Sequence, residues 1–128
     1  MIVHTFDIKQ SLVIVEVIVK VNGRIKRFNF AVDTGATITL VSDDAMKKMG
    51  YTKADIIRTT HTVTASKPET VYEYCLDNIR AIGLIRHNFK VISRSLPIGL
   101  GIDGLLGLNF FKNKELTIDF KRSEIRLK

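Results

Sequence analysis

The chain has 128 residues, 45% of them apolar, which is enough to fill the core of one domain spanning residues 1–128. Its formal charge of +7 comes from Lys and Arg residues dispersed along the sequence, which favours a solvated surface over a block that binds nucleic acid or an anionic membrane. No run of residues reaches the ~18 apolar positions needed to span a membrane, and the single cysteine, Cys75, excludes an internal disulfide.

The first ten residues mix His4, Asp7 and Lys9 with apolar side chains. This order differs from the charged-then-apolar layout of a signal peptide. Together with the lone cysteine, it leads us to expect a cytoplasmic protein in a reducing compartment.

The first regular structure is predicted to be a β-hairpin. Residues 13–21 are rich in Val and Ile and alternate with polar positions, and residues 25–32 resume that pattern. Asn22-Gly23 separates the two runs and is typical of a tight hairpin turn, because both central residues of such a turn need positive φ. The second strand of this hairpin therefore ends at Asp33.

A short strand over residues 38–41 and a helix are expected next. Ser42 is a suitable N-cap, and Gly50 lies where a helix would stop. Acidic residues in the first turn and basic residues in the last turn complement the helix dipole: Asp43, Asp44, Lys47 and Lys48.

The second half of the chain is also predicted to be mainly strand. Residues 59–65 and 70–76 are rich in Thr, Val and Tyr and flank a polar tip at 66–69, which indicates a hairpin. We expect strands near 79–85, 89–93, 116–120 and 125–127, a loop over 94–103 and a short helix over 108–113. The predicted fold is therefore mainly β, a closed or orthogonally packed sheet with one or two short helices.

Two short motifs are candidates for a catalytic site. The first is Ala31-Val32-Asp33-Thr34-Gly35-Ala36, a carboxylate on a turn of small residues after an apolar strand. The second is Asp103-Gly104-Leu105-Leu106-Gly107. Hydrolysis of peptides by carboxylates needs two of them sharing one proton, so a chain with one such turn needs a second chain. Taken alone, Asp-Thr-Gly is equally typical of an ordinary turn at a strand end.

The order of these motifs resembles the retropepsin-like aspartic proteases, the single-domain relatives of retroviral proteases. The resemblance covers residues 13–127 and includes Ile38-Thr39-Leu40-Val41-Ser42, the Thr-rich hairpin, Leu108-Asn109-Phe110-Phe111 and Leu116-Thr117-Ile118-Asp119-Phe120. The last stretches look especially like bacterial and archaeal members. The resemblance implies a closed β-barrel with a flap hairpin, and a homodimeric aspartic endopeptidase that hydrolyses peptides without metal or organic cofactor.

The same resemblance implies roles for individual residues. Asp33 would be catalytic, together with Asp33 of the partner subunit. Thr34 would contact the partner turn, Gly35 would present its backbone to substrate, and Ala36 is small enough to leave room for a peptide. Packing behind the turn would come from Leu105, Leu106 and Gly107, and the flap over the substrate would include Thr64, Ala65, Ser66 and Lys67.

The sequence departs from the family pattern in two places. No glycine lies between Tyr51 and Ile82, whereas family flaps often have one at the tip. This leaves open the alternative of a peptide-binding or scaffold module with little or no hydrolysis. The acidic residue and the arginine that retroviral members carry near the turn correspond here to Thr37 and Leu108, which predicts a different brace with no stranded charge.

Other chemistries have weaker support. The three histidines, His4, His61 and His87, share no metal-ligand spacing, so no metal site is expected. Cys75 lies in a strand pattern that favours a buried, inert thiol over a nucleophile. The run 24–30 interleaves basic and aromatic residues, which suits a nucleic-acid-binding sheet, but a half-buried strand leading to Asp33 explains it better.

Overall fold

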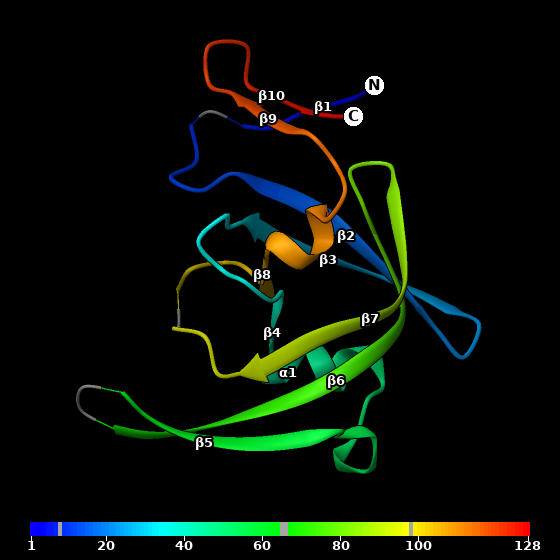
Figure 1. The fold of residues 1–128 in the computed structure, drawn as a ribbon, viewed down its shortest axis with the longest axis vertical. Coiled ribbons are helices and arrows are strands. Elements are labelled where there is room, and N and C mark those ends of the chain that lie inside the picture. The colour runs from blue at the N-terminus through cyan, green and yellow to red at the C-terminus, as the bar shows by residue number, and fades with distance from the viewer. Residues whose placement is uncertain (8, 65–66, 98) are drawn as a thin grey trace.

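The structure is a computed structural model that describes residues 1–7, 9–64, 67–97 and 99–128, and within these ranges it contains ten strands and one α-helix (Figure 1). The elements are β1 (Ile2–Thr5), β2 (Ile14–Val21), β3 (Arg24–Val32), β4 (Leu40–Ser42), α1 (Asp43–Met49), η1 (Lys53–Asp55), β5 (Arg58–Thr64), β6 (Lys67–Ala81), β7 (Leu84–Arg94), β8 (Gly104–Leu106), η2 (Leu108–Phe111), β9 (Leu116–Asp119) and β10 (Glu124–Leu127). No helix in these ranges is long and apolar enough to cross a membrane.

Six strands form a closed barrel. Their order is β2-β3-β8-β4-β7-β6, and β2 pairs again with β6 to close the ring. Strand β5 pairs only with β6, so the β5–β6 hairpin projects from the barrel (Figure 1). The prediction of a mainly β, closed sheet is confirmed.

The first hairpin forms as predicted. Asn22 and Gly23 have φ of 50° and 76°, the left-handed conformation that a two-residue hairpin turn requires. Every second residue of β2 and β3 faces the core, and the largest of these side chains are fully or almost fully buried: Val15, Val17, Val19, Phe28 and Phe30.

Helix α1 also has the predicted ends. The Ser42 hydroxyl accepts a hydrogen bond from the Ala45 N–H, and Gly50 adopts φ of 95° as it closes the last turn onto Lys47 O. The strand before the helix begins at Leu40 rather than at Ile38. Ala36, Thr37 and Thr39 instead accept hydrogen bonds from residues 107–109, and of the four residues 36–39 Thr39 alone also bonds to β7, through the Ile92 N–H.

The prediction for residues 67–85 is wrong in two respects. Residues 67–69, expected in the hairpin tip, belong to β6, which runs unbroken to Ala81. A turn at Ile82-Gly83, with φ of 52° and 71°, interrupts the strand predicted over 79–85. A β-branched residue rarely adopts positive φ, so the sequence carried no turn signal at Ile82.

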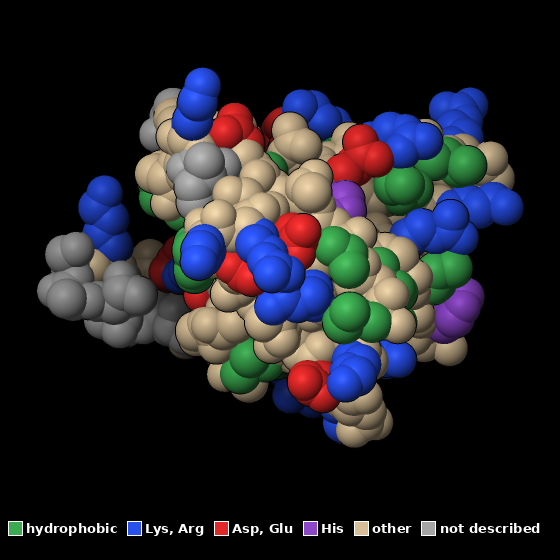
Figure 2. Space-filling model, turned by 90° about the horizontal axis from the view of Figure 1, so that it is seen from above, with side chains coloured by type: hydrophobic (Ala, Val, Ile, Leu, Met, Phe, Trp, Pro, Cys, Tyr) green, Lys and Arg blue, Asp and Glu red, His purple; other side chains and the backbone are tan. Residues whose placement is uncertain are grey.

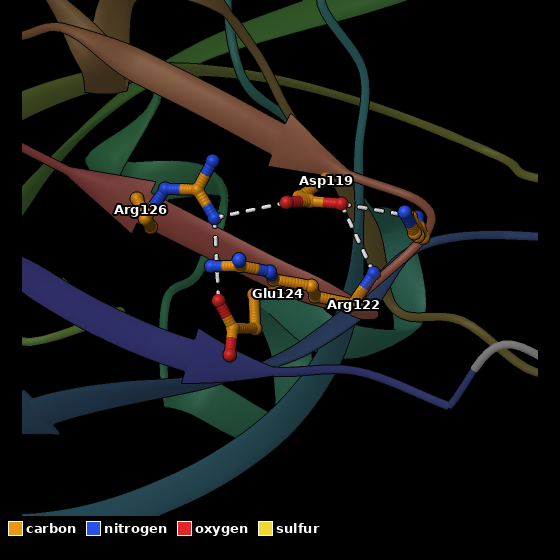
Figure 3. A network of polar contacts seen from close by, with 5 residues as sticks. Asp119, Arg122, Glu124 and Arg126 are labelled. Carbon is orange, nitrogen blue, oxygen red and sulfur yellow. Dashed lines mark hydrogen bonds and ion pairs between the residues drawn. The ribbon is translucent and has the colours of Figure 1, made fainter.

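Strands β1, β10 and β9 form a separate antiparallel sheet that joins the two termini (Figure 1). Strand β1 was not predicted. Figure 3 shows how the β9–β10 turn is held: Asp119 accepts hydrogen bonds from the backbone N–H groups of Lys121 and Arg122 and from Arg126, which also contacts Glu124. The bond from Arg122, followed by that from Arg126, lowers the pKa of Asp119.

The surface charge is dispersed over the face that Figure 2 shows, which is the face nearest the terminal sheet. Lys and Arg side chains are spread across it, with acidic side chains between them. This distribution agrees with the solvated surface that the sequence favoured.

Candidate active site

Asp33 directly follows the last residue of β3, Val32, and begins the turn that leaves the barrel wall. Strand β3 runs parallel to β8, with Val32 opposite Leu106, and the Asp33 N–H donates to Leu106 O at 3.0 Å. The turn then folds back, because the Gly35 N–H donates to Asp33 Oδ1 at 2.9 Å and the Ala36 N–H donates to Asp33 O at 3.2 Å. The half-buried carboxylate is therefore oriented by its own turn.

Thr34 and Gly35 form the exposed part of this turn. A Cβ atom built on Gly35 would lie 3.1 Å from Asp33 Oδ1, so a larger residue would crowd the carboxylate. Because Thr34 is exposed beside Asp33, another molecule that approaches the carboxylate can contact it.

The second motif lies directly against the turn. Leu105 and Leu106 pair with Ala31 and Val32, and Leu106 is fully buried. Gly107 packs against the backbone of the turn: a Cβ there would lie 2.7 Å from Ala36 O and 2.8 Å from Ile38 C. A side chain at position 107 would therefore push the turn outward.

A buried hydrogen-bond network braces this packing, and sequence reasoning assigned no role to its two side chains. Thr39 is fully buried; its hydroxyl donates to Asn109 Oδ1 at 2.8 Å and accepts from the Gly107 N–H at 3.0 Å. Asn109 Oδ1 also accepts from the Thr39 N–H, and Asn109 Nδ2 donates to Lys90 O, both at 2.8 Å. Thr39 and Asn109 could have been predicted from one feature of the sequence. Each is a polar residue between two apolar ones, in Ile38-Thr39-Leu40 and in Leu108-Asn109-Phe110.

Backbone hydrogen bonds continue this network at Thr37 and Leu108, the two positions for which the sequence predicted a brace without a charge pair. Thr37 O accepts from the Asn109 N–H at 3.2 Å, and Ala36 O accepts from the Leu108 N–H at 2.8 Å. The brace is thus neutral, made of backbone bonds and one Thr–Asn pair, which is the kind of difference that the Thr37 and Leu108 positions predicted.

The carboxylate opens onto a cleft of about 410 Å³. Among the described residues that line it, Asp33 supplies the one carboxylate and Arg94 the one cation. The other lining side chains are apolar or small, from the turn, β4, β6, β7 and β8: Gly35, Ala36, Thr37, Ile38, Leu40, Val71, Ile92 and Leu105. This cleft suits an extended chain with aliphatic side chains.

The β5–β6 hairpin forms one wall of this cleft through Val71. Glu69, two residues nearer the tip, accepts a hydrogen bond from Arg94 at 3.2 Å and so ties the hairpin to the end of β7. The last described pair is Thr64 with Lys67. The predicted flap residues Ala65 and Ser66 lie outside the described residues.

The structure weakens the competing chemistries. Phe28 and Phe30 are 7% and 0% exposed, so the aromatic residues of the 24–30 run cannot stack on bases. His61 contacts Thr70 within the hairpin, and the described residues contain no cluster of three or more His, Cys, Asp or Glu side chains fit for a metal. Cys75 is half-buried rather than buried, because it lies between the inward-facing Tyr74 and Leu76.

The sequence and the fold are both similar to those of known proteins. The family model described as "Aspartyl protease" matches residues 17–110, which include both motifs. No curated protein matches the sequence significantly. The fold is similar to the crystal structure of a retropepsin-like aspartic protease from Rickettsia conorii, with a TM-score of 0.73 and 22% identity over 98% of this chain and 88% of that one.

Proposed function

The chain belongs to the aspartyl protease family, and from this premise we propose that it is an endopeptidase whose active site combines Asp33 of two copies of the chain. The observation that carries this proposal is the single carboxylate, held by the Gly35 N–H at a cleft whose other described residues add no second one. Hydrolysis by carboxylates needs a pair, so the second Asp33 comes from a partner subunit.

In the proposed dimer the two carboxyl groups share one proton, because two like charges at hydrogen-bond distance do not both ionise readily. The ionised group takes a proton from water as the water oxygen attacks the carbonyl carbon, and the protonated group gives its proton to the carbonyl oxygen. When the tetrahedral intermediate collapses, the C–N bond breaks, the amine nitrogen takes a proton from the dyad, and one hydroxyl of the intermediate returns a proton to the dyad as the carboxylic acid forms. No metal or organic cofactor takes part.

The proposed substrate is an extended peptide bound between the dyad and the β5–β6 flap. Aliphatic side chains of the peptide would pack on Ile38, Leu40 and Ile92, and its backbone would pair with exposed backbone groups of the turn and flap. Thr34 would contact the partner turn beside the dyad.

The test is digestion of a diverse peptide mixture by the wild type, by Asp33→Asn and by Asp77→Asn, from about pH 4 to pH 7, followed by mass spectrometry. Asp77 is exposed and outside the cleft, so its variant is a matched control. We expect the wild type and Asp77→Asn to cleave the same bonds and Asp33→Asn to lose at least a thousandfold in rate, as removal of half a catalytic pair does.

Equal cleavage by Asp33→Asn would overturn the proposal. If no variant cleaves, retention of peptides by the folded protein would favour the binding-module alternative, for which the flap without glycine is the supporting observation.

A further inference from the structure

A second hollow of about 410 Å³ lies on the outside of the barrel, away from the Asp33 turn. It is lined by three isoleucines, Ile18, Ile25 and Ile85, and by three side chains with basic nitrogen, Lys20, Arg80 and His87. These come from the β2–β3 and β6–β7 hairpins, whose turns lie at the right of Figure 1, away from the Thr64–Lys67 end of the β5–β6 hairpin. We call this hollow the outer groove.

Strand register arranges these side chains in two rows across four strands. In one row Ile18 lies opposite Arg80, and Arg80 lies opposite Ile85. In the other row Lys20 lies opposite Ile25, and His87 opposite Asn78. Paired residues share one face of a sheet, so aliphatic and basic positions alternate across the first row. In the second row Asn78 lies between Lys20 and His87.

The floor of the groove is continuous where the two hairpins cross. The Lys20 N–H donates to Asn78 Oδ1 at 3.3 Å, and Asn78 Nδ2 donates to Lys20 O at 3.2 Å. The Asn78 side chain thus extends the contact between β2 and β6 beyond the last backbone pair, Ile18 with Arg80. The groove is thus part of the closed barrel.

The positive charge of the groove is uncompensated. No carboxylate lines it, and Lys20, Arg80 and His87 form no side-chain hydrogen bond or ion pair with the described residues. The next cation along the first row, Arg27, differs because it pairs with Glu16 at 2.7 Å.

Beside these bases, Ile25 and Ile85 are 61% and 38% exposed. Figure 2 shows hydrophobic, basic and histidine side chains lying together at the right of the molecule. Adjacent exposed aliphatic and unpaired basic side chains are typical of a surface that another molecule covers.

We propose that the outer groove binds an acidic segment of a partner protein, in which carboxylate and aliphatic side chains alternate along an extended backbone. The carboxylates pair with Lys20 and Arg80, and the aliphatic side chains cover the isoleucines. A nucleic acid fits less well, since the groove has no aromatic side chain on which a base could stack and three of its six named side chains are aliphatic. This inference does not depend on the proposed protease activity.

The test uses the full chain with Asp33→Asn, so that the probe is not digested. The probe is a fluorescein-labelled peptide, Gly-Glu-Leu-Glu-Ile-Glu-Leu-Gly, and its matched control has Gln in place of each Glu. Fluorescence anisotropy at physiological salt measures both affinities. We expect the acidic peptide to bind at least about tenfold more tightly than the Gln peptide, because its carboxylates face unpaired bases.

Variants locate the binding. Lys20→Glu with Arg80→Glu should weaken the acidic peptide at least about tenfold, through loss of two attractions and gain of two repulsions. Lys112→Glu with Lys114→Glu makes the same change in net charge at exposed positions outside the groove and should change affinity less than about twofold. Ile25→Thr with Ile85→Thr keeps strand-forming residues and should weaken binding about fivefold.

Three results would overturn the proposal. Equal weakening by the Lys112 and Lys114 variant would indicate nonspecific charge attraction. Unchanged binding by the Lys20 and Arg80 variant would place the peptide elsewhere. Tighter binding of a labelled single-stranded DNA, lost in that same variant, would make the groove a nucleic-acid site. Thermal unfolding checks each variant, and Lys20→Gln with Arg80→Gln, which adds no repulsion, must weaken binding in the same direction.

Discussion

Gly35 and Gly107 lie on opposite sides of the Asp33 turn, and the absence of a side chain matters for a different reason at each. The atom nearest to a Cβ on Gly35 is the carboxylate oxygen of Asp33, at the end of a side chain that can rotate. The atoms nearest to a Cβ on Gly107 belong to the backbone of Ala36, Ile38 and Thr39, which cannot move without distorting the turn. The missing side chain at Gly35 therefore leaves room for the Asp33 carboxylate, and the missing side chain at Gly107 lets the backbone of the turn pack closely.

We predict that alanine at Gly107 mainly lowers stability and that alanine at Gly35 mainly lowers activity. Gly107→Ala should lower the free energy of unfolding by about 2–3 kcal/mol, the cost of overpacking a rigid site. Gly35→Ala should change stability by less than about 1 kcal/mol, yet lower the rate of peptide cleavage at least tenfold, because a displaced carboxylate is poorly oriented. Urea unfolding and peptide hydrolysis of both variants separate the two effects. A larger stability loss in Gly35→Ala than in Gly107→Ala would contradict this reading of the turn.

The Thr39 hydroxyl gives a second prediction at this scale. Thr39→Val keeps the shape of the side chain but leaves the Gly107 N–H without its acceptor, so stability should fall by about 1–3 kcal/mol. Thr60→Val on the exposed strand β5 is the matched control and should stay within about 0.5 kcal/mol of the wild type. Urea unfolding measures both. Similar values for the two variants would show that the buried network does not brace the turn.

Among the elements, those governed by local signals were predictable and those governed by distant partners were not. Asn22-Gly23 and Ser42 form a turn and a cap with their own neighbours, so their patterns predicted β2, β3 and α1 well. Strand β1 exists because β10 lies beside it, and the turn at Ile82 exists because β6 and β7 are paired along their length. In the site, Asp33 follows from its motif, whereas the Thr39–Asn109 contact joins residues 70 positions apart.

The β9–β10 turn carries a prediction for pH. Hydrogen bonds from Arg122 and Arg126 lower the pKa of Asp119 in the folded chain below its ordinary value of 3.8. A lowered pKa in the folded state stabilises the fold above the ordinary value, and this contribution is lost as the pH falls through the folded value. Asp119→Asn should therefore be less stable than the wild type near pH 6, and the difference should shrink below about pH 4. Urea unfolding across this range measures it; a difference that stays constant would contradict the linkage.

At the scale of the whole molecule, one barrel supplies only one of the two Asp33 carboxylates that the proposed mechanism needs. Asp33 and Thr34 lie at the surface of the barrel rather than within a closed active site, and the described lining of the cleft holds one carboxylate. The outer groove shares β6 and β7 with the cleft but is lined by different residues, nearer the β6–β7 turn. Binding there would leave the Asp33 cleft accessible, so a partner held in the groove and a peptide held in the cleft could be bound at once.

The need for two chains can be tested by mixing subunits. If each active site takes one Asp33 from each of two subunits, an equal mixture of wild type and Asp33→Asn that has exchanged subunits should retain about a quarter of the activity of undiluted wild type, because mixed dimers have one carboxylate. Wild type diluted twofold with buffer is the control and should retain about half while its concentration stays well above the dimer dissociation constant. Sedimentation of the same samples reports the dimer directly. Half of the activity or more in the exchanged mixture, or cleavage by a chain that sediments only as a monomer, would show that one Asp33 suffices.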